Sequence, residues 1–337
     1  VAQRGTSNAA FGAGYLVADR FRFGNNGSYG NQSQYTVTQD SNAPDGFAYS
    51  MKLSVGADIA APSSTQASFM EQIFEKTNVD CLAYGTSSAK SVTLSFWVKS
   101  SLTGQFGVAL AINSTISNSR NYTISSANTW EKKTLTFTGN TSTAISGDTF
   151  KLRFGLAFGS TLAQSGGDSW VSGTYYGASG NVNLGDTQNA TWQITGVQLE
   201  LGDTATDFEH RSYGEELALC QRYYEIVADA SQSSDNTIHY VCGGFSTKSD
   251  QVNWNYFFQV VKRGTFTLEA TTGTDYYKAR NHTDFIVDTA VGMTADYQGL
   301  NCVNGYISGS YSGSTEGKAW QFTLNNANAK IAVSAEL

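Results

Sequence analysis

Proline is nearly absent from this sequence. Only Pro44 and Pro62 occur among 337 residues, and both lie in stretches with the composition of loops. Because proline has no N–H group to donate to a neighbouring strand, it argues against a central strand wherever it stands. None of the strand-like segments identified below contains one, so the sequence permits extensive β-sheet.

Charge is also scarce. Charged residues make up 15% of the chain, and 21 Lys and Arg against 28 Asp and Glu give a formal net charge of −7. No run of Lys or Arg occurs, so the basic footprint of a nucleic-acid-binding surface is missing. We therefore expect no nucleic-acid partner.

Long apolar runs are missing as well. No stretch approaches the roughly 20 apolar residues of a membrane-spanning helix, which predicts no membrane insertion. The first ten residues, VAQRGTSNAA, lack the apolar core of a signal peptide. Both observations predict a soluble protein.

Cysteine occurs four times, as Cys81, Cys220, Cys242 and Cys302, without a CxxC pair or the spacing of a zinc site. The sequence also lacks a DxDxD loop of calcium ligands. We therefore predict no cofactor and assign no metal, and the question of bound calcium stays open.

Aromatic residues, in contrast, are abundant, at 13% of the chain with 18 Tyr and 19 Phe. Short strand-like segments without intervening helices begin near residues 34, 49, 67, 92, 106, 120 and 130. The clearest spans 150–158, where apolar residues at even positions alternate with residues such as Lys151 and Arg153, predicting one core face and one wetter face. The count fits an all-β fold with an eight-stranded jelly-roll β-sandwich.

The alternation breaks at Gly196. Trp192 and Ile194 are apolar at even positions before it, whereas Val197 and Leu199 are apolar at odd positions after it. A phase slip of one residue at a glycine predicts a β-bulge in this strand.

A short helix is predicted after that strand. Ser212 and Glu215 have the spacing of a capping box, in which each side chain satisfies a backbone N–H of the first turn. The helix should begin at about Tyr213, and its apolar face should extend to Tyr224 and Ile226. We expect it to pack between two β units, with Cys220 buried on its apolar face.

The segment 196–224, GVQLELGDTATDFEHRSYGEELALCQRYY, carries a resemblance. It is similar to a signature of bacteriophage tail-fibre and related virion proteins, especially of marine phages. In that signature a carbohydrate-binding-module-like jelly roll ends in GVQLE and is followed by FEHR and a helix containing ELALCQRYY. The resemblance extends more loosely over about residues 19–224. A proline often precedes the phenylalanine of FEHR, and Asp207 stands there in this chain, which questions the rigidity of the turn.

The resemblance implies a virion structural protein on the phage tail or capsid surface, assembled in the cytoplasm of the host bacterium. Its implied partners are host surface polysaccharide and other phage tail or capsid proteins. The leading hypothesis is a tail-fibre or receptor-binding subunit that adheres to host surface glycans without catalysis. The alternatives are a capsid decoration, cement or head-fibre protein and, third, a glycan depolymerase.

Together with the strand pattern, the resemblance divides the chain into four parts. Residues 1–18, rich in Gly and Ala, should form an N-terminal arm ordered by a partner. Residues 19–201 should form the jelly roll, 202–227 a junction loop and helix, and 228–337 a small C-terminal β domain of about six strands.

Catalytic residues are not evident. Hydrolysis of sugars needs two carboxyl groups about 5–10 Å apart in a cleft. Glu209, Glu215 and Glu216 cluster in sequence, but Glu215 fits the cap and Glu216 lies in a first helical turn, where acids favour the helix dipole. His210, His239 and His282 lack the spacing of a metal site or a triad. The resemblance supplies no catalytic residues, and we expect no enzyme.

A candidate carbohydrate-binding site lies between residues 159 and 189, where strand alternation stops. Trp170, Tyr175 and Tyr176 stand in a Gly-rich segment where planar rings can stay exposed to a sugar, and Asp168 could bind hydroxyl groups. Packing of the same loop on its own sheet or on a neighbouring subunit is an equal alternative. Trp97 and Trp130 lie inside strand patterns and are interpreted as core or sheet-face aromatics.

An oligomer interface is predicted in the C-terminal domain. Trp254, Tyr256, Phe257 and Phe258 crowd one predicted strand, so its rings point to both faces. A small domain with open sheet edges and few charges should bury such rings against neighbouring subunits. Phage fibres are usually trimeric, and the resemblance therefore implies a homotrimer.

Overall fold

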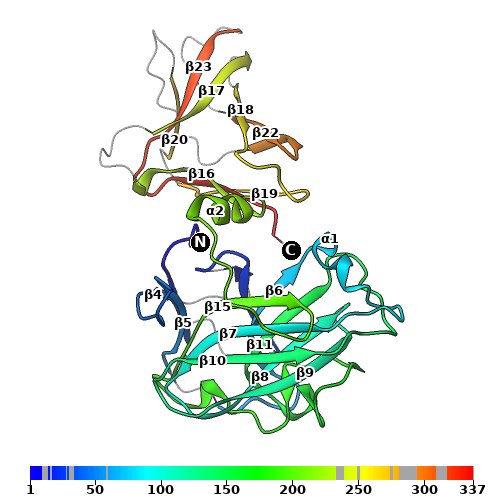
Figure 1. Ribbon diagram of the computed structural model, residues 1–337. Helices are drawn as coiled ribbons and strands as arrows, with labels where there is room; N and C mark the ends of the chain where they lie inside the picture. Colours follow the sequence, from blue (N-terminus) through cyan, green and yellow to red (C-terminus); the bar gives the residue numbers. More distant parts are fainter. Residues whose placement is uncertain are drawn as a thin grey trace. The chain divides into compact units, whose positions relative to one another are not determined.

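The structure is a computed structural model, and it describes residues 1–9, 14–15, 17–27, 29, 34–57, 60–232, 239–248, 251–273, 276–280, 294–308 and 317–336. The chain forms two compact units, which we call the N-terminal unit (Ala2–His210) and the C-terminal unit (Arg211–Glu336). Both are built mainly from β-strands (Figure 1). The prediction of an all-β fold is confirmed.

The N-terminal unit is a sandwich of two antiparallel sheets. The six-stranded sheet contains, in order, β1 (Ser7–Ala9), β4 (Tyr35–Asp40), β5 (Ser50–Val55), β15 (Thr191–Leu201), β7 (Val92–Ser100) and β10 (Glu131–Phe137). The seven-stranded sheet contains β13 (Val171–Ser172), β9 (Ile116–Ile124), β8 (Gly104–Ile112), β11 (Phe150–Phe158), β6 (Ala67–Phe74), β3 (Phe21–Asn26) and β2 (Gly14–Tyr15). The short elements are α1 (Lys76–Val79) and the parallel pair β12 (Ala163–Gln164) and β14 (Gly177–Ala178).

The core of this unit lies between the two sheets. Phe96 of β7 and Phe154 of β11 are both fully buried, and their ring centroids are 5.2 Å apart across the sandwich. Trp192 of β15 is also buried and donates its indole N–H to the hydroxyl of Tyr122 at 2.9 Å. A buried tryptophan is stable in such a core because its one polar atom has a partner.

The described residues among 1–18 do not form a separate arm, contrary to the prediction. β1 pairs with β4, β2 pairs with β3, and the side chain of Val17 belongs to the core. The small residues contribute backbone hydrogen bonds at the sheet edges, and composition alone does not reveal that kind of bond.

The bulge at Gly196 is confirmed. The pairing of β15 with β7 shifts between Thr195 and Gln198, and Gly196 has a φ of 58°. The signature segment then folds back: Gln198 accepts the N–H of Glu209 at 2.8 Å and donates to the carbonyl of Asp207 at 3.2 Å. We call residues 198–210 the clasp, since they double back over the outer side of β15.

The capping box and the start of α2 (Tyr213–Gln221) are confirmed, and Cys220 is buried. The helix is shorter than predicted, because Tyr224 and Ile226 belong to strand β16 (Tyr224–Asp229). The sequence periodicity could not show that β16 pairs with a strand more than a hundred residues later, β24 (Lys330–Ser334).

The C-terminal unit contains two sheets as well as α2. The three-stranded sheet has the order β16, β24 and β19 (Thr267–Ala270). The six-stranded sheet contains β20 (Tyr277–Arg280), β23 (Ala319–Leu324), β17 (His239–Lys248), β18 (Gln251–Phe257), β22 (Cys302–Ser308) and β21 (Thr294–Gly299). The described residues therefore hold nine strands here, against about six predicted.

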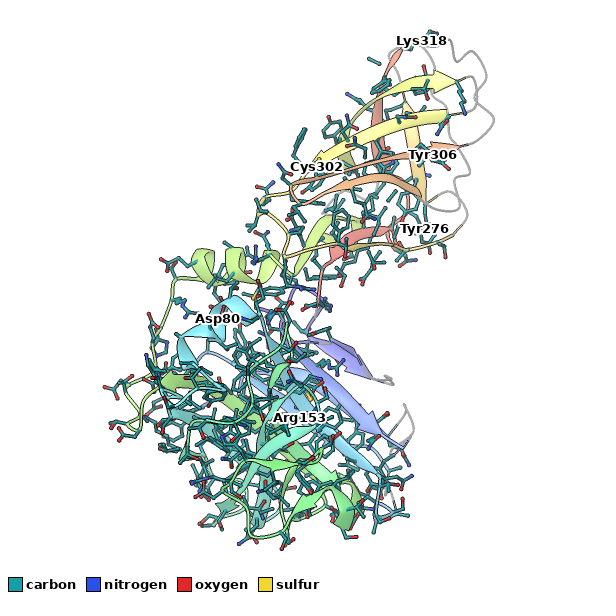
Figure 2. All side chains as sticks on the ribbon, turned by 90° about the vertical axis from the view of Figure 1, so that its right-hand side faces the viewer. Asp80, Arg153, Tyr276, Cys302, Tyr306 and Lys318 are labelled. Atoms are coloured by element: carbon teal, nitrogen blue, oxygen red, sulfur yellow. The ribbon has the colours of Figure 1, made fainter. Side chains whose placement is uncertain are left out.

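A buried ion pair joins Glu225 of β16 to Lys262, which follows β18 and also bonds the last residue of α2. Glu225 and Lys262 are both fully buried and lie 2.5 Å apart, and Lys262 also donates to the carbonyl of Gln221. Tyr256 and the N–H of Gln259 donate to the other oxygen of Glu225. Both oxygens of the carboxylate are therefore satisfied, which burial of a charge requires. Figure 2 shows the side chains of this unit, with Cys302 and Tyr306 labelled on β22.

Candidate functional site

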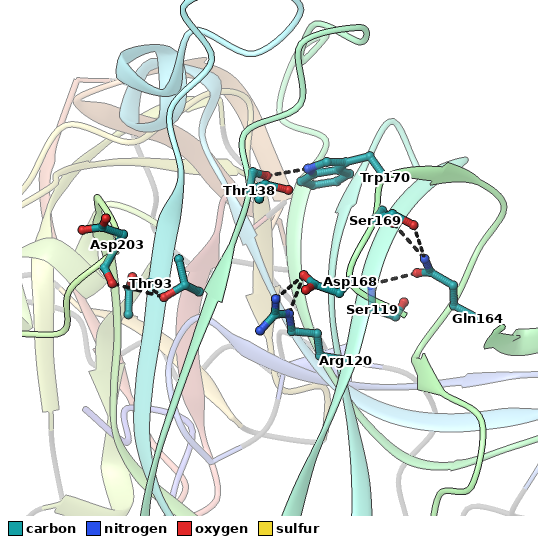
Figure 3. Close-up of polar contacts among 10 residues, drawn as sticks. Thr93, Ser119, Arg120, Thr138, Gln164, Asp168, Ser169, Trp170 and Asp203 are labelled. Carbon is teal, nitrogen blue, oxygen red and sulfur yellow. Dashed lines mark hydrogen bonds and ion pairs between the residues drawn. The ribbon is translucent and has the colours of Figure 1, made fainter. Parts of the chain in front are cut away.

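The predicted site residues lie in residues 159–178, which we call the strap loop. The loop leaves β11, contributes β12, β13 and β14, and runs along β9, with which β13 pairs. The side chain of Gln164, within the loop, ties it to β9. Gln164 accepts the N–H of Ser119 at 2.9 Å and donates to the carbonyl of Ser169 at 2.8 Å (Figure 3). The strap loop is therefore an ordered part of the sandwich, built from irregular backbone.

Asp168 lies at the turn of the strap loop with its carboxylate half exposed. One carboxylate oxygen accepts a hydrogen bond from Nε of Arg120 at 2.8 Å (Figure 3). The backbone N–H of Asp168 donates to the carbonyl of Ser119. Its φ of 55° is left-handed, an unusual conformation for a residue with a side chain. Strained residues held by their surroundings are concentrated at functional sites.

Trp170 closes the open edge between the two sheets. Its indole N–H donates to the carbonyl of Thr138 at 2.7 Å, just after β10 of the opposite sheet (Figure 3). Its ring lies edge-on to that of Tyr84, with the ring centroids 5.6 Å apart, and packs against the core between the two sheets. The ring is therefore only partly exposed. Packing therefore accounts for much of this ring, which agrees with the alternative considered from the sequence.

Tyr176 is not an exposed ring, contrary to the prediction. It is 3% exposed, and its ring centroid lies 4.5 Å from that of Phe69 and 5.2 Å from the guanidinium carbon of Arg153. The neighbouring Tyr175 is half-buried, with its hydroxyl 3.4 Å from the carbonyl of Ser172. Of the two adjacent tyrosines, one faces the sheet and only Tyr175 retains an accessible ring.

The outer face of β11, beneath Tyr176, is buried and carries charged side chains, whereas the alternation of β11 predicted a solvent-exposed face. Arg153, labelled in Figure 2, donates from Nε to the buried carboxylate of Glu71 at 2.9 Å, and Arg22 donates to the other oxygen. Burial alone would raise the pKa of Glu71, but Arg153 and Arg22 outweigh burial and hold that pKa below its usual value. Burial likewise raises the pKa of Tyr176.

Arg120 is a site residue that the sequence interpretation missed. It stands on β9 in phase with the core-facing Tyr122 and Ile124, and its guanidinium lies 5.6 Å from the ring of Phe137. A charged residue in an apolar phase of a strand is a signal that could have identified it. Asp168 presents a half-exposed carboxylate paired with the less exposed guanidinium of Arg120, and the same loop carries the partly exposed rings of Trp170 and Tyr175. This arrangement can donate and accept hydrogen bonds from hydroxyl groups and contact an apolar ring face.

The acidic residues considered for catalysis have structural contacts. Glu215 completes the capping box, Glu216 lies 3.3 Å from Arg211, and Glu209 is exposed in the clasp. The side chain of His210 contacts the rings of Phe47 and Phe208, whereas His282 lies outside the described residues.

Within the described ranges, no cluster of three His, Cys, Asp or Glu residues could hold a metal ion. The same ranges contain no helix with the length and apolar character needed to cross a membrane.

The predicted interface residues, in β18 and immediately after it, differ in exposure. Trp254 is buried in the core of the C-terminal unit, where it stacks on Phe322, and cannot contact a second subunit. Tyr256 and Phe258 are partly buried against the same core. Phe257 is 72% exposed, so only this ring has the accessibility that an interface requires.

Comparison with known proteins found no matching family model and no similar curated protein. Solved structures with partial similarity include the enzymatically active domain of tailspike protein 4 of bacteriophage CBA120, with 14% identity over 54% of this chain and a TM-score of 0.32. The matched region spans 19% of that tailspike structure.

Two further similar structures are carbohydrate-binding domains. The family 11 module of Clostridium thermocellum, solved with a mixed-linked tetrasaccharide, has 10% identity over 60% of this chain and 97% of its own, with a TM-score of 0.29. The N-terminal cellulose-binding domain of Cellulomonas fimi β-1,4-glucanase C has 11% identity over 50% of this chain and 85% of its own, with a TM-score of 0.27. Similarities this low carry no conclusion about the ligand of this chain.

Proposed function

We propose that this chain is a phage virion structural protein, a tail-fibre or receptor-binding subunit, that adheres to host surface glycans through the strap loop without catalysis. The observation that carries the proposal is the half-exposed carboxylate of Asp168, paired with Arg120 of β9, in the same irregular loop that carries the partly exposed rings of Trp170 and Tyr175. A saccharide needs both kinds of contact, ring surface for its CH face and polar groups for its hydroxyls. The resemblance of the signature segment supports the assignment to a virion.

Pre-organisation supports a binding role for this loop. Thr174 donates to the carbonyl of Ser114 at 2.6 Å, and Asn121 both accepts from the N–H of Ala178 and donates to its carbonyl. A loop fixed in this way loses little conformational entropy when a ligand binds. The same rigidity argues against a movable lid over a catalytic cleft.

Binding of the purified full chain to a panel of bacterial surface polysaccharides tests the proposal. Tyr175→Ala should weaken binding at least tenfold, and Tyr175→Phe should retain most of it because the ring remains. Asp168→Asn should also weaken binding, whereas Asp45→Asn, at another exposed loop aspartate, should not. Equal binding by wild type, Tyr175→Ala and Asp168→Asn would contradict the role of the strap loop.

A capsid decoration or head-fibre role is the second candidate, and one observation favours it. Seven of the nine most exposed large apolar side chains among the described residues belong to the C-terminal unit, including Tyr213, Phe257 and Val261. Such exposure suits protein partners better than a polysaccharide. Affinity for assembled capsids without affinity for any polysaccharide would favour this second role.

A further inference from the structure

A second group of aromatic and polar side chains lies on the outer side of the six-stranded sheet. The core-facing residues of β7 are Leu94, Phe96 and Val98, all fully buried, so Trp97 between them points outward and is half-buried. The register of the sheet places Lys132 of β10 and Thr195 of β15 directly beside it. We define the tryptophan face as Trp97, Lys99, Trp130, Lys132 and Asn42.

Trp130 and Lys99 are held together by one amide. The side-chain oxygen of Asn42 accepts the indole N–H of Trp130 at 3.0 Å and a hydrogen bond from the ammonium of Lys99. That ammonium lies 5.2 Å from the centroid of the Trp130 ring. The ring and the charge therefore keep a fixed relation at the surface, although neither belongs to the core.

The support of Asn42 continues into the neighbouring strands. Its carbonyl accepts the hydroxyl of Ser50 at 2.7 Å, and the buried amide of Gln193 donates to that hydroxyl at 3.2 Å. Asp40 accepts the N–H of Asn42 and pairs with Lys52 at 3.2 Å. This network holds Asn42 in place, and through it the ring of Trp130 and the ammonium of Lys99.

Only part of this outer side is covered. The clasp occupies the rows of the sheet beyond Gly196, where Gln198 and Glu200 bind the backbone of residues 206–209. Trp97 and Lys99 lie in the rows before Gly196 and remain partly accessible. The clasp therefore ends where the tryptophan face begins.

The positive charges near the tryptophan face favour an anionic ligand. Lys52, Lys99 and Lys132 stand on this part of the sheet beside Asp40, whose carboxylate is paired with Lys52. Lys132 is exposed, and the ammonium of Lys99 donates to the side-chain amide oxygen of Asn42. A surface excess of positive charge in a chain of net charge −7 attracts an anionic ligand.

We propose that the tryptophan face is a second saccharide site that takes a carboxylated polysaccharide, with Trp97 contacting a sugar ring and Lys99 and Lys132 pairing with its carboxylates. The proposal rests on the proposed function only in taking saccharides as the ligand class, because the two sites share no residue. A saccharide bearing uronic acids combines the ring face and the carboxylate that this surface can recognise.

The test is affinity electrophoresis or calorimetry of the full chain with alginate, a polymer of uronic acids, and with a neutral mixed-linked β-glucan. Lys99→Gln with Lys132→Gln should weaken binding to alginate at least tenfold and should flatten its dependence on salt. Trp97→Ala should weaken alginate binding to a similar degree. The control Lys76→Gln, at an exposed lysine of α1, should bind alginate like the wild type.

The strap-loop variants separate this proposal from the proposed function. Asp168→Asn and Tyr175→Ala should leave alginate binding unchanged if the tryptophan face is the site. Loss of alginate binding in those variants alone would overturn the proposal while supporting the strap loop. Absence of alginate binding by the wild type, or wild-type binding by the double lysine variant, would also overturn it. The exposed position of Lys132 ensures that Lys132→Gln can be examined in a folded chain.

Discussion

The ring of Phe47 rests on Gly196. A Cβ atom added to Gly196 would lie 2.6 Å from Cζ of Phe47, closer than such contacts occur in proteins. The ring centroid of Phe47 also lies 5.0 Å from that of Phe208 and 5.2 Å from that of His210, so Gly196 and the end of the clasp meet at one ring. The glycine therefore has two roles, a positive φ at the bulge and space for the ring that anchors the clasp.

Replacement of Gly196 by alanine should destabilise the N-terminal unit for both reasons. Gly147 is a matched control, because its φ of 59° is nearly the same as that of Gly196 and nothing lies within 4 Å of an added Cβ. Gly147→Ala should cost roughly 1–2 kcal/mol, the price of a left-handed alanine. Gly196→Ala should cost about 1–3 kcal/mol more, since the ring must move. Urea unfolding measures both, and equal losses would contradict the packing of Phe47 on Gly196.

Much of the N-terminal unit could be predicted from the sequence because its signals are local. The alternation of β11 predicted its limits, 150–158, and the phase slip predicted the bulge at Gly196. In the C-terminal unit, the capping box likewise predicted the first residue of α2. In each of these cases the backbone geometry depends on residues within a few positions.

The features that the sequence did not reveal depend on distant partners. Tyr176 is buried because Phe69 and Arg153, on other strands, receive its ring. The same holds for β1, whose partner is β4, and for β16, whose partner is β24. Exposure of an aromatic loop residue is therefore set by tertiary contacts that composition and spacing do not encode.

The capping box of α2 should behave as a coupled pair. The hydroxyl of Ser212 accepts the N–H of Glu215 at 3.3 Å, and the carboxylate of Glu215 accepts the N–H of Ser212 at 3.0 Å. Ser212→Ala should cost about 1 kcal/mol of unfolding free energy. A double-mutant cycle with Glu215→Ala should show a departure from additivity larger than about 0.5 kcal/mol. Additive losses would mean that the two bonds form independently.

The pH dependence of the same cap has a defined sign. The hydroxyl and the N–H of Ser212 lower the pKa of Glu215 below its usual value of 4.5 in the folded chain. Because the pKa of Glu215 is lower in the folded than in the unfolded chain, its ionised carboxylate stabilises the fold at pH values above the unfolded pKa. This stabilisation is lost as the pH falls through the folded-state pKa. Ser212→Ala should therefore reduce the acid sensitivity of α2 in circular dichroism. Identical acid transitions for both chains would argue against a charged cap.

The buried pair of Glu71 and Arg153 should be sensitive to loss of one partner. Glu71 is fully buried between Arg153 and Arg22, so Glu71→Gln leaves two cations without their counter-ion. We expect a loss of about 3–5 kcal/mol in urea unfolding. The control Asp80→Asn breaks an exposed pair with Lys76 and should change stability by less than about 1 kcal/mol. Similar losses for both variants would contradict the burial of Glu71.

The same carboxylate should contribute to acid unfolding. Arg153 and Arg22 outweigh the effect of burial, so the pKa of Glu71 is below 4.5 in the folded chain. The ionised Glu71 stabilises the folded chain fully at pH values above its unfolded-state pKa, and this stabilisation is lost as the pH falls through its folded-state pKa. The free energy of unfolding of the wild type should fall more steeply below about pH 5 than that of Glu71→Gln. Parallel curves would show that Glu71 does not titrate during unfolding.

The proposed homotrimer should depend on Phe257 in the C-terminal unit. Light scattering of the full chain should give three times its mass of 36.2 kDa. Phe257→Glu replaces a ring that is 72% exposed with a charged side chain. The substitution should therefore lower the measured mass towards that of one chain without unfolding the protein. Tyr49→Glu, at an exposed ring of the N-terminal unit, is the control. A wild-type chain that stays monomeric at micromolar concentration would rule out the trimer.

Adhesion without chemistry is the central claim, and one measurement addresses both halves of it. Purified full chain is titrated onto immobilised bacterial surface polysaccharides while reducing ends released into the solution are counted. We expect saturable binding to at least one polysaccharide, weakened at least tenfold in Tyr175→Ala, with no reducing ends above the protein-free blank. Release of reducing ends by the wild type, or absence of binding to every polysaccharide in the panel, would contradict it.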